Sequence, residues 1–235
     1  MDSGTPLKPN LDGSSVASLR RLEDSDLPFA IAEHSKHFPD NVMARLGPLF
    51  LRQYYKSFLN TPFAVATVAE MDGEPCGYLV GVLDTDQHRR LLLRRHGVAL
   101  LSTSSVGLAL RPGLAVRLLA RRTKVRLRRI LSRLSDARQP TVGSVAVLSH
   151  IAVSEDARSR GVGRALVQNF TEIARASGAG RISLATLDGP TGAGPFYEAQ
   201  GWEYESSYRT IDGRWIRLYN LPLTAWSANC EESPG

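Results

Sequence analysis

Apolar positions in the second half of the chain follow two spacings, one typical of strands and one of helices. The stretch 145–153 is a β-branched run ending in Ile-Ala-Val and bounded by polar residues. Beyond residue 164, helical spacing continues until Gly178, carried by Leu166, Phe170, Ile173 and Ala174. The pattern predicts a strand over 142–153 and a helix over 163–177, joined by the polar turn 158–164.

The same two spacings predict elements along the rest of the chain. Expected strands cover 18–21, 63–70, 76–83, 181–186, 204–210 and 215–221, and expected helices cover 27–38, 46–59 and 195–201. Asp72-Gly73 and Asp212-Gly213 are hairpin turn signals between consecutive strands. These elements predict a mixed α/β fold with a sheet of about seven strands.

Residues 86–140 form an insertion of different composition. Between residues 88 and 138 there are 14 Lys and Arg against one acid, whereas the remainder has 15 basic and 22 acidic residues. Helices are expected over 89–101 and 108–134, with a Ser-rich break between them. Such a basic amphipathic surface could cover the sheet, form a homodimer contact, capture an anionic substrate or lie on a membrane. Because the arginines alternate with leucine and not with aromatics, no specific nucleic-acid partner is expected.

Length and cysteine content indicate one domain in a reducing compartment. The 235 residues fit a single domain over 16–223, with a disordered tail at 1–15 and a second tail at 224–235. Cys76 and Cys230 give neither a disulfide nor a metal-ligand pattern, so no metal is expected. The N-terminus lacks a signal-peptide pattern, and a cytoplasmic location is expected.

The turn 158–164 has the composition of an anion site. Gly161 and Gly163 allow close backbone approach, and the N-terminus of the following helix adds free N–H groups and partial positive charge. Three arginines add further charge. The spacing matches neither a nucleotide P-loop nor the dinucleotide-binding fingerprint.

Two motifs together resemble the GNAT superfamily of acyl-CoA-dependent acyltransferases. Arg-x-x-Gly-x-Gly follows the Ile-Ala-Val strand end, and 193–202 is similar to the family's Ala-x-x-aromatic-Tyr-Glu-x-x-Gly-Phe element, with Trp202 for Phe. The resemblance implies a mostly antiparallel sheet, splayed between strands 4 and 5, that binds acetyl-CoA as acyl donor. The implied donor-binding residues are Ile151, Ala152, Val153, Arg158, Ser159, Arg160, Gly161, Val162, Gly163, Arg164 and Phe196.

The resemblance also implies catalytic roles. Tyr197 matches the family's proton donor to the leaving thiolate. Several relatives carry a Glu base on strand 4, but the corresponding residue here is Val147. His150 is the candidate base, directly or through water, and water chains, Glu70, Asp188 or a substrate amine of low pKa stay open. Acceptor-site candidates on the first two helices are His34, His37, Tyr54 and Tyr55.

The function expected from these residues is N-acetyl transfer from acetyl-CoA to a primary amine of a small molecule. Without a nucleophilic Cys or Ser motif, direct attack in a ternary complex is favoured over a covalent acyl-enzyme. Acceptors that stay open include amino sugars, other metabolites and protein amines, and the donor could carry a longer acyl group. A non-catalytic acyl-CoA-binding or regulatory module is the alternative from another class.

Overall fold

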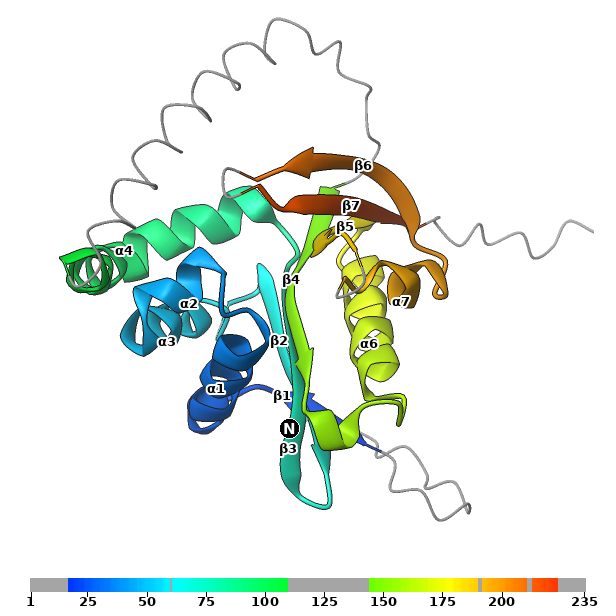
Figure 1. Ribbon diagram of the computed structural model, residues 1–235, viewed down its shortest axis with the longest axis horizontal. Coiled ribbons are helices and arrows are strands. Elements are labelled where there is room, and N and C mark those ends of the chain that lie inside the picture. The colour runs from blue at the N-terminus through cyan, green and yellow to red at the C-terminus, as the bar shows by residue number, and fades with distance from the viewer. Residues whose placement is uncertain (1–16, 60, 110–143, 190–191, 211–212, 224–235) are drawn as a thin grey trace, which may run out of the picture.

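A seven-stranded sheet forms the centre of the protein (Figure 1). The computed structural model describes residues 17–59, 61–109, 144–189, 192–210 and 213–223. The strands are β1 (Ser18–Arg21), β2 (Ala64–Met71), β3 (Glu74–Val82), β4 (Ser144–Val153), β5 (Ala179–Leu187), β6 (Glu203–Arg209) and β7 (Trp215–Pro222). Their order is β1-β2-β3-β4-β5-β7-β6, and every neighbouring pair is antiparallel except β4 and β5. The predicted mixed α/β sheet is confirmed.

Helices cover both faces of the sheet (Figure 1). One face carries α1 (Leu27–His37), α2 (Val42–Leu46), α3 (Pro48–Lys56) and α4 (Thr85–Ala109), and the other carries α6 (Val162–Ala176) and α7 (Gly194–Glu198). Two short 3₁₀ turns, η1 (Asp24–Asp26) and η2 (Glu155–Ala157), precede α1 and α6. Each face buries its own apolar core, one centred on Tyr55 and Tyr78 and the other on Phe170 and Leu166.

Two predicted helix boundaries are wrong. A single helix was expected over 46–59, but Gly47, with φ of 96°, separates α2 from α3 because a residue in this conformation cannot continue an α-helix. The expected break after residue 101 is also absent, since α4 continues to Ala109. There the Thr103 hydroxyl donates to the carbonyl of Ala99 at 2.7 Å, so this polar side chain is accommodated within the helix. The expected helix 108–134 lies almost wholly outside the described residues, as do both predicted tails.

The predicted hairpins are confirmed. Asp72 and Gly73 have φ of 54° and 82°, the pair of positive values that a two-residue type I′ turn requires. Their turn joins β2 to β3. The turn between β6 and β7 includes Asp212, which lies outside the described residues, and Gly213, with φ of 86°.

The sheet opens between its two parallel strands. Pairing of β4 with β5 runs from Ser144 opposite Ala179 to Leu148 opposite Leu184 and then stops. Beyond this point β5 continues to pair with β7, and β4 pairs only with β3. The predicted splay is confirmed, and it leaves one edge of the β4 backbone over 149–153 without a strand partner among the described residues.

None of the helices in the described part of the chain has the length and apolar character needed to cross a membrane.

Candidate active site

A bulge in β4 decides which face of the sheet His150 occupies. Val80 of β3 pairs with His150 and Gly81 pairs with Leu148, so Ser149 is an extra residue in β4. Before the bulge, Leu148 belongs to the core under α6. After it, Ala152 belongs to the opposite core, under α1 and α3. The extra residue therefore turns His150 toward the helices that carry the predicted acceptor residues.

An aromatic cluster surrounds His150. Its ring centroid lies 4.8 Å from that of His34, 5.7 Å from those of Phe38 and Tyr54, and 6.5 Å from that of Tyr55. The structure thus brings together the predicted base and three of the four predicted acceptor residues, whereas His37 lies beside Arg158 and Glu33 instead. Their exposure differs, however: His34 and Tyr55 are completely buried, whereas Tyr54 and His150 are partly exposed. Of the predicted residues in the cluster, Tyr54 and His150 therefore have surface for direct contact with an acceptor.

A hydrogen-bonded chain of buried side chains supports this cluster. His34 Nδ1 lies 2.7 Å from the Tyr55 hydroxyl, which lies 2.7 Å from the Tyr78 hydroxyl. The other imidazole nitrogen of His34, Nε2, is buried without a hydrogen-bond partner among the described residues. Each hydrogen bond in this series can form with either group as the donor. The tautomer of His34 therefore determines the orientation of the Tyr55 hydroxyl, and through it that of the Tyr78 hydroxyl.

Both clustered histidines are neutral at physiological pH. Burial lowers the pKa of His150 to about 3, with the neighbouring His34 adding to the shift. Burial likewise lowers the pKa of His34 to about 4. Desolvation disfavours the charged imidazolium, and no carboxylate among the described residues is a cause of either shift. A neutral His150 retains a ring nitrogen that can accept a hydrogen bond or a proton.

The turn before α6 has the backbone geometry of an anion cradle. Ser159 and Gly161 have φ of 61° and 80°, and Gly161 is the residue from which α6 begins. A Cβ built on Gly161 would meet no heavy atom within 4 Å, so the positive φ and not crowding explains this glycine. Arg158, Arg160 and Arg164 are all exposed around the turn. These residues fit a pyrophosphate, which the N-terminal amides of a helix bind well.

Close side-chain packing, and not only backbone approach to a ligand, explains the glycine at position 163. A Cβ at this position would lie 3.3 Å from Cζ of Phe196 and 3.8 Å from Cγ2 of Val153. The glycine therefore lets the Phe196 ring pack closely against the first turn of α6. This contact brings three of the predicted donor-binding residues together, from β4, α6 and α7.

Arg158 connects the turn to α1. Its Nη2 lies 3.2 Å from Nδ1 of His37, and His37 Nε2 lies 3.0 Å from a carboxylate oxygen of Glu33. Lys36 of the same helix lies 3.3 Å from Glu155. The C-terminal turn of α1 is thereby held next to the predicted anion site.

Tyr197 lies in the core on the α6 side. It is 4% exposed, and its ring centroid lies 5.5 Å from Trp202, 5.1 Å from Phe196 and 6.4 Å from Tyr219. Burial raises the pKa of its phenol, so the hydroxyl stays protonated at neutral pH. Tyr197 and His150 therefore belong to opposite faces of the sheet.

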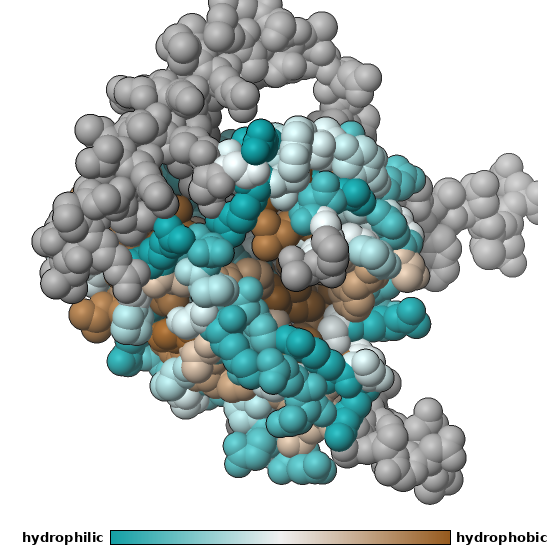
Figure 2. Space-filling model, viewed as in Figure 1, coloured by the Kyte–Doolittle hydropathy of each residue, from teal (hydrophilic) through white to brown (hydrophobic). Residues whose placement is uncertain are grey.

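Figure 2 shows apolar side chains gathered in a recess near the centre of this view, between β4 and α7.

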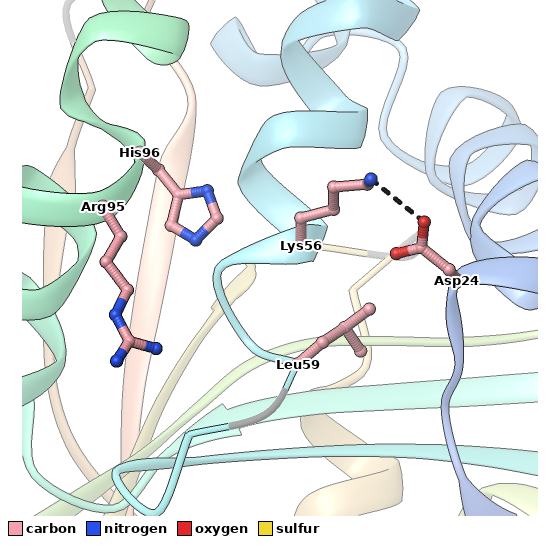
Figure 3. A pocket seen from close by; sticks show the side chains of 5 residues that line it. All are labelled: Asp24, Lys56, Leu59, Arg95 and His96. Atoms are coloured by element: carbon pink, nitrogen blue, oxygen red, sulfur yellow. Dashed lines mark ion pairs between the residues drawn. The ribbon is translucent and has the colours of Figure 1, made fainter.

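A separate pocket of about 300 Å³ lies between α3 and α4 (Figure 3). It is lined by Asp24, Lys56, Leu59, Arg95 and His96. Lys56 Nζ lies 3.0 Å from Asp24, so the basic group at one side is already paired. None of the predicted site residues lines this pocket. Among the described residues, no group of three His, Cys, Asp or Glu side chains could hold a metal ion.

Comparison with known proteins relates part of the chain to a family and its fold to solved structures. Residues 130–202 match the model of the acetyltransferase (GNAT) family. Among solved structures, the ribosomal-protein-S18-alanine N-acetyltransferase from Escherichia coli is similar, with 16% identity and a TM-score of 0.51 over 92% of this chain and 100% of that one. The segment 130–202 therefore matches the GNAT acetyltransferase family, and the described chain has a GNAT-like fold. The N-acetyltransferase from Staphylococcus aureus Mu50 shares the GNAT fold, with 12% identity and a TM-score of 0.56 over 89% of this chain and 100% of that one. No curated protein matches in sequence.

Sequence reasoning missed two residues of this GNAT candidate site. Tyr78 lies within the strand expected over 76–83 and Phe38 ends the helix expected over 27–38, but neither was a site candidate. Their roles depend on contacts with Tyr55 and His150, which come from distant parts of the chain. Only the aromatic character of both residues hinted at a place in the cluster.

Proposed function

We propose that this GNAT-family transferase moves the acetyl group of acetyl-CoA to a primary amine of a small molecule, by direct attack in a ternary complex. The end of β4–β5 pairing at Leu148 carries the proposal. It frees backbone groups of Ile151 and Val153 to pair with the amide-containing arm of the donor, as an added strand would. The arm would then run from the turn at Gly161 toward the opening.

The turn residues 158–164 would bind the pyrophosphate end of the donor. The first amides of α6 follow Gly161, and the exposed Arg158, Arg160 and Arg164 contribute positive charge. Phe196 and Val153 pack beside this turn and would exclude water from the donor arm. The other donor-binding residues expected from the sequence would line this route or, like the buried Ala152 and Val162, support it from the core.

Acetyl-CoA supplies the acetyl group as a thioester. The amine nitrogen attacks the carbonyl carbon, a carbon–nitrogen bond forms, and the carbon–sulfur bond breaks. In our proposal the Tyr197 hydroxyl donates its proton to the departing thiolate. Burial raises the pKa of this phenol, so its proton is present at neutral pH. Free backbone N–H groups of β4 can stabilise the negative charge that develops on the carbonyl oxygen.

The proton of the attacking amine would pass to His150. Because burial holds its pKa at about 3, His150 is too weak a base to deprotonate a free alkylammonium ion. It is better suited to accept the proton once the nitrogen has bonded to carbon and become more acidic. The acceptor would therefore enter as the neutral amine, between Tyr54 and His150, with His34 and Tyr55 supporting the wall from behind.

Initial-rate kinetics test this proposal. Thiol release is measured with a panel of small primary amines while acetyl-CoA and amine concentrations are both varied. Direct attack predicts intersecting double-reciprocal lines, because both substrates are bound before product leaves. Parallel lines would indicate a covalent acyl-enzyme, and acetyl-CoA binding without thiol release for any amine would contradict the proposed reaction.

A further inference from the structure

The helix α4 presents apolar side chains to solvent. Leu93, Val98 and Leu101 are 60%, 84% and 67% exposed. These are three of the eight large hydrophobic side chains that are exposed in the described part of the chain. Because three of them lie on one helix, α4 is a candidate contact surface for another molecule or a membrane.

The same helix carries a concentration of positive charge. Arg89, Arg90, Arg94 and Arg95 are exposed, and none of them forms an ion pair with another described residue. Asp86 is the only acidic residue among positions 85–109. The four arginines lie in the first half of α4, and positions 96–109 contain no Asp, Glu, Lys or Arg.

Spacing places both kinds of side chain on one face. Arg90, Arg94, Val98 and Leu101 follow one another at intervals of four, four and three residues, which align along one side of an α-helix. Leu93 lies three residues from Arg90 and extends the same surface. We call the surface formed by Arg90, Leu93, Arg94, Val98 and Leu101 the α4 face.

We propose that the α4 face docks the protein on an anionic lipid surface. Its arginines match the phosphate headgroups in charge, and its exposed aliphatic side chains can enter the boundary between headgroups and acyl chains. No described helix can cross a membrane, so α4 would lie in the plane of the surface. Nucleic acid is the less favoured polyanion, because its binding would leave the aliphatic groups in water and α4 has no Phe, Tyr or Trp to stack on bases.

The proposal does not rest on acetyl transfer. The α4 face includes none of the residues assigned to the donor site, the catalytic pair or the aromatic cluster. A failure of the enzymatic proposal and a failure of lipid docking would therefore be seen in separate experiments.

Vesicle co-sedimentation of the full chain tests the proposal. The protein is incubated with vesicles of pure phosphatidylcholine or of equal parts phosphatidylcholine and phosphatidylglycerol. We expect binding to the anionic vesicles that is at least about tenfold stronger than to the zwitterionic ones and that weakens with added salt. Arg90→Glu/Arg94→Glu should reduce binding to the anionic vesicles by about 30-fold or more, since each basic residue near the surface contributes measurably.

Two further variants separate the α4 face from net charge. Arg21→Glu/Arg175→Glu changes the charge equally at exposed residues outside α4 and should bind almost as the parent protein does. Leu93→Ser/Val98→Ser keeps the charge and should bind about tenfold more weakly, because it removes the apolar contribution. Circular dichroism and thermal melting check that each variant is folded.

Three outcomes would overturn the proposal. The first is equal binding of the parent protein to both vesicle types, or to neither. The second is an equal loss of binding in the α4 and control charge variants, which would indicate a general charge effect. The third is salt-sensitive binding to a duplex DNA probe, lost in Arg90→Glu/Arg94→Glu, without binding to anionic vesicles.

Discussion

Nδ1 of His34 lies 2.7 Å from the hydroxyl oxygen of Tyr55, and neither side chain is exposed to solvent. This bond ties α1 to α3 directly behind His150, and the Tyr78 hydroxyl extends it to β3. A buried polar group that loses its partner keeps its full desolvation cost. The chain of three groups therefore stabilises the wall of the candidate acceptor site only while it stays complete.

Tyr55→Phe should destabilise the protein more than Tyr78→Phe. Loss of the Tyr55 hydroxyl leaves both His34 Nδ1 and the Tyr78 hydroxyl unpaired, at a cost of about 2–4 kcal/mol. Tyr78→Phe breaks one bond and leaves Tyr55 bonded to His34, at a cost of about 1–2 kcal/mol. Urea unfolding measures both values. A larger loss in Tyr78→Phe would contradict the described order of the chain.

Stability should fall in acid because of the two clustered histidines. An unfolded histidine takes up a proton near pH 6.5, whereas folded His34 and His150 do so only near pH 4 and 3. Between these values the unfolded state holds more protons, so the free energy of unfolding decreases as the pH falls. Each histidine contributes up to about 1.4 kcal/mol per pH unit. The fall should begin near pH 6.5 and continue toward pH 4.

Denaturant titrations from pH 7 to 4 check this dependence. His150→Gln should lessen the slope by about 1.4 kcal/mol per pH unit. Tyr78→Phe removes no group that titrates in this range and should keep the parent slope. An unchanged slope in His150→Gln would mean that the pKa of this histidine is not lowered in the folded protein.

Gly161→Ala and Gly178→Ala form a matched pair for the donor site. The two glycines have φ of 80° and 81°, and a Cβ on either meets no heavy atom within 4 Å. Each substitution should therefore cost about 1–2 kcal/mol of stability through backbone strain alone. Only Gly161 precedes α6, whereas Gly178 follows it, so only Gly161→Ala should weaken acetyl-CoA binding, by about tenfold. Calorimetric titration measures the affinity of each variant for acetyl-CoA. Equal affinities of the two variants would show that the donor does not bind at this turn.

Tyr197→Phe tests the proposed proton donor. Without the hydroxyl, the thiolate must leave unprotonated, and kcat should fall by about 10²–10⁴-fold while acetyl-CoA affinity stays near that of the parent. Tyr208→Phe, which removes the hydroxyl of a tyrosine that is 40% exposed on β6, serves as control and should keep full turnover. Unchanged kcat in Tyr197→Phe at saturating substrates would exclude the assigned role.

Local signals predicted the fold more successfully than the site. The Asp72-Gly73 hairpin and the β4–turn–α6 unit depend on residues close in sequence, and both are confirmed. The helix boundaries near Gly47 and Thr103 were predicted wrongly. Apolar spacing continues through Gly47 although the helix ends there, and Thr103 lies in a Ser-rich stretch although the helix continues through it.

The position of His150 could not be predicted from its strand alone. The bulge at Ser149 depends on pairing between β3 and β4, and an unbulged strand would have placed His150 on the opposite face. For the same reason, the union of His34, Tyr55 and Tyr78 could not be read from spacing, since they come from three separate elements. Both arrangements depend on contacts between distant parts of the chain, which the local sequence pattern does not contain.

Mass spectrometry of the complete reaction tests the central claim most directly. Protein, acetyl-CoA and the amine panel are incubated and quenched, and the masses of amine, coenzyme and protein are measured together. Direct transfer predicts that one amine gains a single acetyl group, that free CoA appears in equal amount, and that the protein mass is unchanged during turnover. An acetylated protein that forms and decays as the amine product appears, or no acetylated amine at all, would contradict the account.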